Sequence, residues 1–229
     1  MSHLESFKQI HQRACERKGG PQALAALIDK PLSVKALSKI SDDRFLAAFT
    51  QKVFQSGFVW RVVRNKWPDF ERVFFGFNIE KILLIPDEML EQKATDPSII
   101  RNYNKVKTIR DNAIMIDSVA REHGSFAKFV ADWPTDDIIG LWAYLKKHGA
   151  RLGGNTGPYG LRAIGKDTFL LTNDIVGYFT QRNIISGSAQ SKRSLTAIQK
   201  SFNELQQQSG LSLQELSMIL SRSVGDNYQ

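Results

Sequence analysis

A glycine-rich stretch, RLGGNTGPYGLRAIG at residues 151–165, is the part of the chain whose composition most clearly suggests chemistry. Glycine lets the backbone adopt positive φ angles and approach another group closely, and the free N–H groups at the start of the next helix point outward. Together these features favour an anion site. A nucleic-acid phosphate there would be bound by loop residues and flanking cations, namely Gly153, Gly154, Asn155, Thr156, Lys146, Lys147 and Arg151.

Two other interpretations of this stretch are open. A helix-to-helix turn uses glycine merely as a C-cap and needs no ligand. A nucleotide-binding P-loop is disfavoured, because the Gly-Lys-Ser/Thr ending is missing and no strand precedes the loop. Elsewhere, Arg101 and Lys105 are four residues apart, which predicts that both lie on one helical face within reach of a phosphate. Solvated surface is the alternative for that pair.

Composition limits the class of protein. The 229 residues are 42% hydrophobic, enough for one or two domains with a buried core, and the formal net charge of +8 suits a partner that carries phosphates. Cys15 is the single cysteine, so we expect a reducing, cytoplasmic compartment and no intrachain disulfide. No signal peptide and no apolar run of membrane-spanning length is evident. We expect a soluble monomer.

Helical periodicity predicts an all-α fold. Phe45, Phe49 and Val53 form an apolar stripe that begins after a cap at Ser41 or Asp42, and Gly57 ends that helix. Further segments repeat this spacing. A helix-hairpin-helix is expected at about 141–165, with a loop through the glycines and a second helix from about 155. We divide the chain into an N-terminal extension (1–40), a core (41–185) and a C-terminal helical pair (186–229).

A second stretch, residues 54–116, adds an ordered series of motif residues: Gln55, Gly57, Trp60, Phe74, Phe77, Ile99-Ile100-Arg101, Lys105, Asn112 and Ala113. LGGNTGPY resembles the helix-hairpin-helix element of the DNA glycosylase superfamily, and the ordered series is similar to the 3-methyladenine DNA glycosylase I family. The resemblance extends over residues 42–180. It implies a two-lobed helical fold with an appended C-terminal pair, and a partner, double-stranded DNA containing alkylated bases.

The implied activity is base-excision repair. Such an enzyme flips the damaged base out of the stack and hydrolyses its N-glycosidic bond, leaving an abasic site, here for 3-methyladenine or a related alkylated purine. By the resemblance, Trp60 stacks on the flipped base and Gln55 lies nearby, although Trp60 beside two apolar residues would also suit a core. Lys52 stands in place of the family's base-reading glutamate, where a cation would repel a cationic base unless it points to solvent or to DNA. No cofactor is expected.

An aspartate follows the hairpin across the wider superfamily and stabilises the sugar cation that forms as the base departs. Asp174 lies about twenty residues after Gly154 and matches that place. The type I branch, however, is described as working without this aspartate. In another alignment, Thr172 occupies the position of the aspartate. The alternative role for Asp174 is to cap a helix that begins at Ile175.

Besides Lys52, two departures from the family affect the prediction. The last glycine of the hairpin motif falls on Thr156. The chain lacks the ligand residues for the family's structural zinc, because Cys15 is the single cysteine and Ile175 stands in place of a histidine. We therefore predict no metal. Lys166 is the lysine nearest to the second hairpin helix, and we expect it to be exposed and the enzyme to be monofunctional. The rival hypothesis is a catalytically inactive DNA-binding protein that serves as a damage sensor or scaffold.

Overall fold

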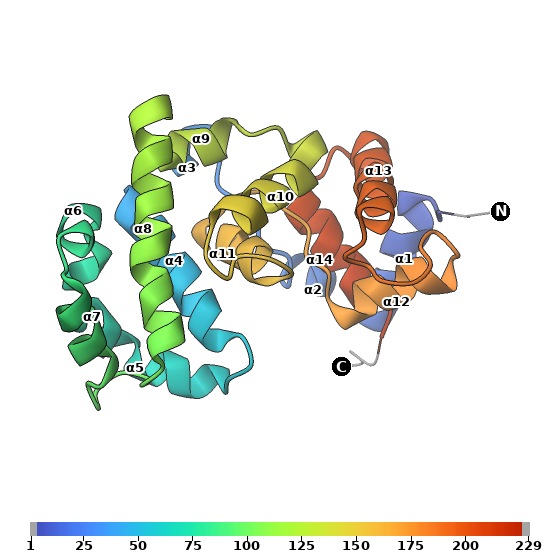
Figure 1. The fold of residues 1–229 in the computed structure, drawn as a ribbon. Helices are drawn as coiled ribbons and strands as arrows, with labels where there is room; N and C mark the ends of the chain where they lie inside the picture. Colours follow the sequence, from blue (N-terminus) through green and yellow to red (C-terminus); the bar gives the residue numbers. More distant parts are fainter. Residues whose placement is uncertain (1–3, 226–229) are drawn as a thin grey trace. The chain divides into compact units, whose positions relative to one another are not determined.

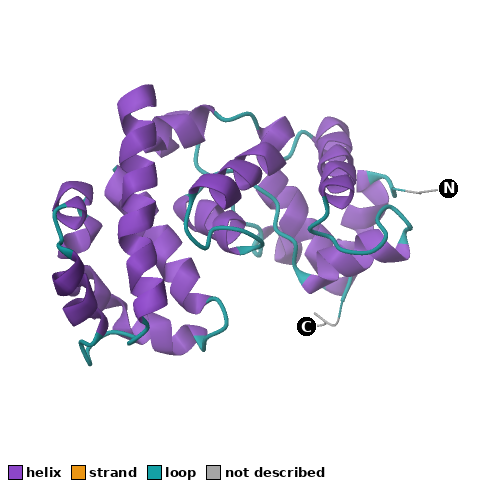
Figure 2. Ribbon diagram, viewed as in Figure 1, coloured by secondary structure: helices purple, strands orange, loops and turns teal. Residues whose placement is uncertain are grey.

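The computed structural model describes residues 4–225, and all of these lie in helices or loops, with no strand (Figures 1 and 2). The all-α prediction is confirmed. None of the helices in this range is long and apolar enough to cross a membrane. The chain forms two compact units, which we describe separately. The first comprises residues up to 32, 134–140 and 167 onward, and the second comprises 33–133 and 141–166.

The second unit contains the hairpin. Its helices are α3 (Val34–Leu37), α4 (Asp42–Gln55), α5 (Trp60–Val73), the 3-10 helix η1 (Phe75–Phe77), α6 (Ile79–Leu83), α7 (Asp87–Ala94), α8 (Tyr103–His123), α9 (Phe126–Asp132) and α11 (Thr156–Ile164). Helix α10 (Ile138–His148) begins in the residues of the first unit and continues into the second. Helix α4 packs against both α8 and α11, as Figure 1 shows.

Phenylalanine side chains form the core of the second unit. Phe45 and Phe49 of α4 are fully buried and meet Phe126 of α9 edge to face, with ring centroids 5.4 and 6.0 Å apart. The N-terminus of α9 is bound by Asp42, whose carboxylate accepts hydrogen bonds from the N–H groups of Phe126 and Ala127 at 2.9 Å. Burial of these rings and this cap fix α4, the helix that carries Lys52 and Gln55.

The first unit consists of α1 (Phe7–Arg17), α2 (Pro21–Ala25), the 3-10 helix η2 (Thr135–Asp137), α12 (Asn173–Gln181), α13 (Lys192–Ser209) and α14 (Leu213–Ser223). The predicted C-terminal helices are therefore present, and α14 packs on α1, α12 and α13. Phe169 stacks on Phe202 at 4.4 Å in its core. The predicted segments 1–40, 41–185 and 186–229 do not coincide with the two units, and their independence as domains stays a prediction.

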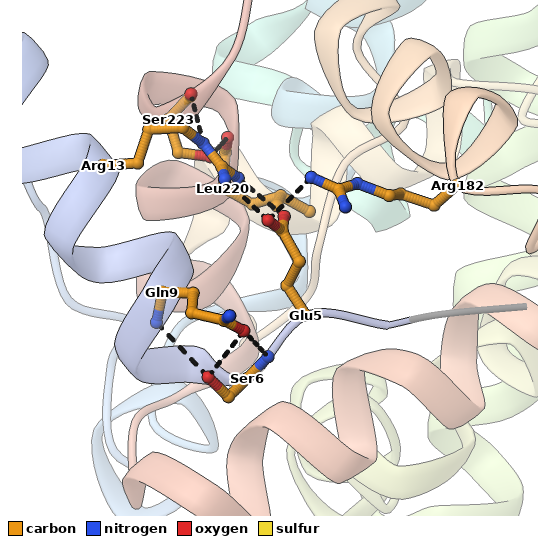
Figure 3. Close-up of polar contacts among 7 residues, drawn as sticks. All are labelled: Glu5, Ser6, Gln9, Arg13, Arg182, Leu220 and Ser223. Atoms are coloured by element: carbon orange, nitrogen blue, oxygen red, sulfur yellow. Dashed lines mark hydrogen bonds and ion pairs between the residues drawn. The ribbon is translucent and has the colours of Figure 1, made fainter.

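A network of charged side chains joins the N-terminal segment to α1, α12 and α14 (Figure 3). Glu5 accepts two hydrogen bonds from the Arg13 guanidinium at 2.8 and 2.9 Å and forms an ion pair with Arg182 at 2.6 Å. Arg13 also donates to the carbonyl oxygen of Ser223. The hydrogen bonds from Arg13 hold the pKa of Glu5 below its usual value, and burial together with Glu5 raises the pKa of Tyr178 to about 12.

Candidate nucleic-acid interface and base-recognition site

The hairpin has the predicted form of helix, glycine-rich loop and helix. Helix α10 ends at His148, α11 begins at Thr156, and Lys146, Lys147 and Arg151 are exposed. Gly154 has a φ of +60°, and a Cβ added there would meet nothing within 4 Å, so this glycine serves the backbone conformation of an open loop tip. Among residues 4–225, no backbone carbonyl accepts a hydrogen bond from the N–H of Gly153 or Gly154. Their amides are available to a phosphate.

Two buried side chains anchor this loop to its unit. Asn112 of α8 is fully buried and makes two hydrogen bonds to Ala150, accepting from its N–H at 2.8 Å and donating to its carbonyl at 3.1 Å. Leu152 is buried one residue before the glycine pair, and its carbonyl accepts from the N–H of Gly157 at 3.1 Å. The exposed amides are thus held on a fixed turn, which keeps the entropic cost of binding low.

Close packing joins α11 to α4. A Cβ added at Gly160 would lie 2.5 Å from the Phe49 ring, so only glycine permits the observed approach of the two helices. One residue earlier, Tyr159 meets Trp60 edge to face, with ring centroids 6.0 Å apart. The second hairpin helix therefore contributes an aromatic contact to the candidate base-stacking residue.

Trp60 lies at the start of α5 and its side chain is 47% exposed, so it is not part of the core. The turn before it presents two more exposed apolar side chains, Phe58 and Val59. Gln55, at the end of α4, is buried, and its Oε1 accepts a hydrogen bond from Lys52 Nζ at 3.0 Å. The same Nζ lies 5.6 Å from the Trp60 ring centroid. The structure therefore brings together all three predicted pocket residues.

Lys105 and Arg101 differ from the prediction. Helix α8 begins at Tyr103 with Asn102 as its N-cap, so Arg101 precedes the helix and the two cations do not share a helical face. Arg101 is exposed. Lys105 instead donates to the carbonyl oxygens of Phe54 and Ser56, at 3.2 and 2.7 Å, and so binds the C-terminal end of α4. The spacing of four was misleading because the helix begins at the capping asparagine, between the two residues.

Positive charge gathers at this end of the second unit. Burial, and next Arg64, lower the pKa of Lys52, while burial and Arg151 lower the pKa of Lys105. Within the described residues, no carboxylate forms an ion pair with Lys52, Arg64, Lys105 or Arg151. A half-exposed indole that lies beside the Lys52 ammonium suits a flat aromatic base attached to a phosphate chain.

Asp174 belongs to the first unit, in the first turn of α12. The N-cap of this helix is Thr172, whose hydroxyl accepts from the N–H of Ile175 at 3.3 Å, so the capping role considered for Asp174 is wrong. A Cβ added at Gly225 would lie 2.2 Å from Asp174 Oδ1, which shows that the carboxylate lies against the C-terminal segment. Its catalytic role stays a prediction.

The expected exposure of Lys166 is also wrong. Its side chain is buried, and Nζ donates to the carbonyl oxygens of Trp133 and Ala131 at 2.6 and 3.3 Å. These bonds join the end of α9 to the residue after the C-cap of α11, which is a structural role. In residues 4–225 no group of three or more His, Cys, Asp or Glu side chains is placed to hold a metal ion.

Sequence reasoning missed Tyr159 and Arg64 as parts of this site. Arg64 lies four residues after Trp60 on α5, so helical spacing alone places it on the same face. Tyr159 ends the LGGNTGPY motif, but its contact with Trp60 could not be predicted from that motif, because it depends on how α11 packs on α4. Asn112 was noted as a motif residue, but its bonds to Ala150 could be seen only in three dimensions.

Comparisons with known proteins agree with this geometry. The family model of methyladenine glycosylase matches residues 36–152, just over half of the chain. No curated protein sequence matches this chain.

Two solved structures of the 8-oxoguanine DNA glycosylase from Methanocaldococcus jannaschii share the fold. One, described as a glycosylase/lyase and bound to a 15mer DNA containing 8-oxoguanine, is 16% identical with a TM-score of 0.55, over 93% of this chain and 95% of that one. The other is 17% identical with a TM-score of 0.53, over 93% and 91%.

A 3-methyladenine DNA glycosylase I from Staphylococcus aureus is 22% identical with a TM-score of 0.48, over 68% of this chain and 91% of that one. The family match covers the hairpin's first helix, its loop as far as Leu152, and the Trp60 region together. The chain belongs to the methyladenine glycosylase family and is a DNA glycosylase.

Proposed function

We propose that this DNA glycosylase removes 3-methyladenine or a related alkylated purine from double-stranded DNA and leaves an abasic site. The observation that supports the proposal most directly is the half-exposed Trp60 ring, which adjoins Gln55 and Lys52 and contacts the hairpin through Tyr159. A flipped purine needs a flat aromatic surface to replace the stacking that it loses in the duplex.

DNA binding would begin at the hairpin. The amides of Gly153 and Gly154, with Asn155 and Thr156 at the start of α11, bind one phosphate, and Lys146, Lys147 and Arg151 contribute charge around it. The exposed Arg101 would bind a phosphate independently of the hairpin. Lys105 has a different role in this scheme. Because it binds the carbonyls at the end of α4, it holds the turn that leads to Trp60.

The exposed turn between α4 and α5 would meet the duplex where the base has left. Phe58 is 44% exposed and Val59 is 63% exposed. Apolar side chains that enter a base stack keep the duplex open and offset part of the unstacking cost. This turn is therefore the part of the second unit best suited to fill the gap.

The chemical step is a hydrolysis. The bond between the sugar C1′ and the purine nitrogen breaks with its electron pair on the base, and water adds to C1′ and loses a proton. That proton goes to solvent when the base leaves as a neutral molecule, and an uncharged purine, which leaves as an anion, takes up one proton in exchange. A purine that is already cationic leaves as a neutral molecule and needs little help. We propose that Asp174 stabilises the positive charge that develops on the sugar, which matters most for an uncharged base.

A monofunctional mechanism is part of the proposal. A lyase of the Schiff-base type needs an amine at C1′, and Lys166, the nearest lysine to the second hairpin helix, is bound to two backbone carbonyls. Borohydride added during turnover should therefore trap no covalent adduct with DNA. A cytoplasmic location and a monomeric state also stay predictions. Gel filtration with light scattering tests the monomeric state.

Release of free methylated base from methylated duplex DNA tests the function. The parent protein should release base, and Trp60→Ala should lower the single-turnover rate by about 100-fold through loss of the stacking surface. Phe75→Ala is the matched control, because Phe75 is an aromatic residue of similar exposure that lies outside the site. If the parent binds abasic DNA tightly and releases neither a methylated base nor any other alkylated purine, the protein is a damage sensor and the proposal is wrong.

A further inference from the structure

We propose that Lys52 makes the base pocket select an uncharged purine whose edge offers hydrogen-bond acceptors, in preference to a cationic purine such as N3-methyladenine. This inference rests on the proposed glycosylase function and specifies its substrate class. An alkylated purine of this kind is 1,N6-ethenoadenine, which carries no charge and no N–H donor on its altered edge.

The hydrogen bonding beside Trp60 supports this preference. Lys52 Nζ donates to Gln55 Oε1 at 3.0 Å, so the acceptor of the Gln55 amide is already used and its NH2 group remains for a ligand. The Lys52 ammonium has further N–H donors of its own. A base that stacks on Trp60 therefore meets donors from both side chains at its edge. A base with ring-nitrogen acceptors satisfies them, whereas the amino group of N3-methyladenine presents donors to donors.

The charge around the pocket points in the same direction. The face of a tryptophan ring attracts cations, but the Lys52 ammonium already lies 5.6 Å from the Trp60 centroid. Arg64 of α5 adds a second positive charge near Lys52, and the group that α11 places against Trp60 is the Tyr159 ring rather than a carboxylate. No ion pair within residues 4–225 compensates Lys52 or Arg64. A cationic base would meet two like charges.

An uncharged base is also the harder leaving group, so the two halves of the proposal fit together. Its departure develops more charge on the sugar, and the enzyme has to supply the stabilisation that a cationic leaving group would provide. A pocket that selects uncharged purines is consistent with a chain that retains a carboxylate at position 174.

The test compares two duplexes, one with 1,N6-ethenoadenine and one with N3-methyladenine. Single-turnover release is measured for the parent, Lys52→Glu and Lys52→Met, and each rate is divided by the spontaneous loss of the same base. The parent should accelerate loss of the uncharged base more. Lys52→Glu should move the ratio of the two accelerations toward N3-methyladenine by about 100-fold, and Lys52→Met by about 10-fold.

Melting temperature and affinity for abasic DNA serve as controls for folding. If Lys52→Glu does not fold, the ratio of accelerations measured for Lys52→Met tests the proposal. The methionine side chain has a length similar to that of the aliphatic part of lysine and carries neither the charge nor the N–H donors. A ratio that both folded variants leave unchanged would overturn the role of Lys52 while leaving the glycosylase function standing. Release of neither base by the parent, with abasic DNA still bound, would instead overturn the proposed function, and this inference with it.

Discussion

In the first unit, Arg13 and Arg182 are held by the carboxylate of Glu5, whereas Lys52 beside Trp60 and Arg151 in the hairpin loop of the second unit form no ion pair within residues 4–225. Arg13 and Arg182 both contact Glu5, and Arg13 also reaches the backbone of α14 (Figure 3).

The same residue types therefore serve two purposes. A guanidinium bound to a carboxylate ties segments of one unit together and contributes little field outside it. Cations without such a partner raise the local potential and attract a polyanion, and binding releases the counterions of the DNA. Sequence composition reports only the sum, a net charge of +8, and does not show which cations are free to act on a ligand.

Asp174→Asn has the largest expected effect, and it tests whether the first unit takes part in chemistry at all. We expect base release to slow by about 100-fold or more with DNA affinity unchanged, because one preorganised charge is lost from the transition state. The loss should be greater for an uncharged base than for a cationic one. Since Thr172 caps α12, the substitution leaves that cap intact. Single-turnover release at the parent's rate would confine the mechanism to the second unit.

A substitution at the hairpin tip has the next largest effect. Gly154→Val should lower the affinity for any duplex, damaged or not, by about 10-fold, and reduce the dependence of binding on salt by about one phosphate contact. The matched control is Gly187→Val in the first unit, where φ is also positive (+74°) and a Cβ would meet nothing within 4 Å. Both variants should lose about 1 kcal/mol of stability. Equal DNA affinity for the two would show that the loop is only a turn.

A pair of arginine substitutions tests the comparison directly, with smaller effects. Arg151→Ala should weaken duplex binding by about fivefold and leave the free energy of unfolding within about 0.5 kcal/mol of the parent value. Arg182→Ala should do the reverse, leaving DNA affinity unchanged and lowering stability at pH 7 by about 0.5 kcal/mol, since the pair is partly exposed.

Acid titration tests the expected loss of stability in Arg182→Ala. The pKa of Glu5 is lowered in the folded protein, so the stabilisation from its partners is present above the pKa of the unfolded chain. It is lost as the pH falls through the folded value. The stability difference between Arg182→Ala and the parent should therefore disappear at acid pH. A difference that persists after Glu5 is protonated would mean that Arg182 stabilises the unit through packing.

Local rules predicted the elements well. Glycine positions and capping residues predicted the two hairpin helices, whereas the grouping of Lys52, Gln55 and Trp60 was implied by the family resemblance. The same rules were wrong for Arg101, because Asn102 begins the helix between it and Lys105. They were wrong for Lys166, whose partners at Ala131 and Trp133 are more than thirty residues away in the sequence. Contacts between distant segments leave no mark in local spacing.

The close approach of Gly160 to Phe49 limits how this sequence can change. A methyl group at position 160 would need space that only a smaller residue at position 49 can supply, so the two positions form a matched pair. Gly160→Ala and Phe49→Leu should each be harmful alone and less harmful together. Substitutions that arrive one at a time must then pass through a poorly packed intermediate. The hairpin and the helix that carries the base pocket are therefore expected to change together or to stay as they are.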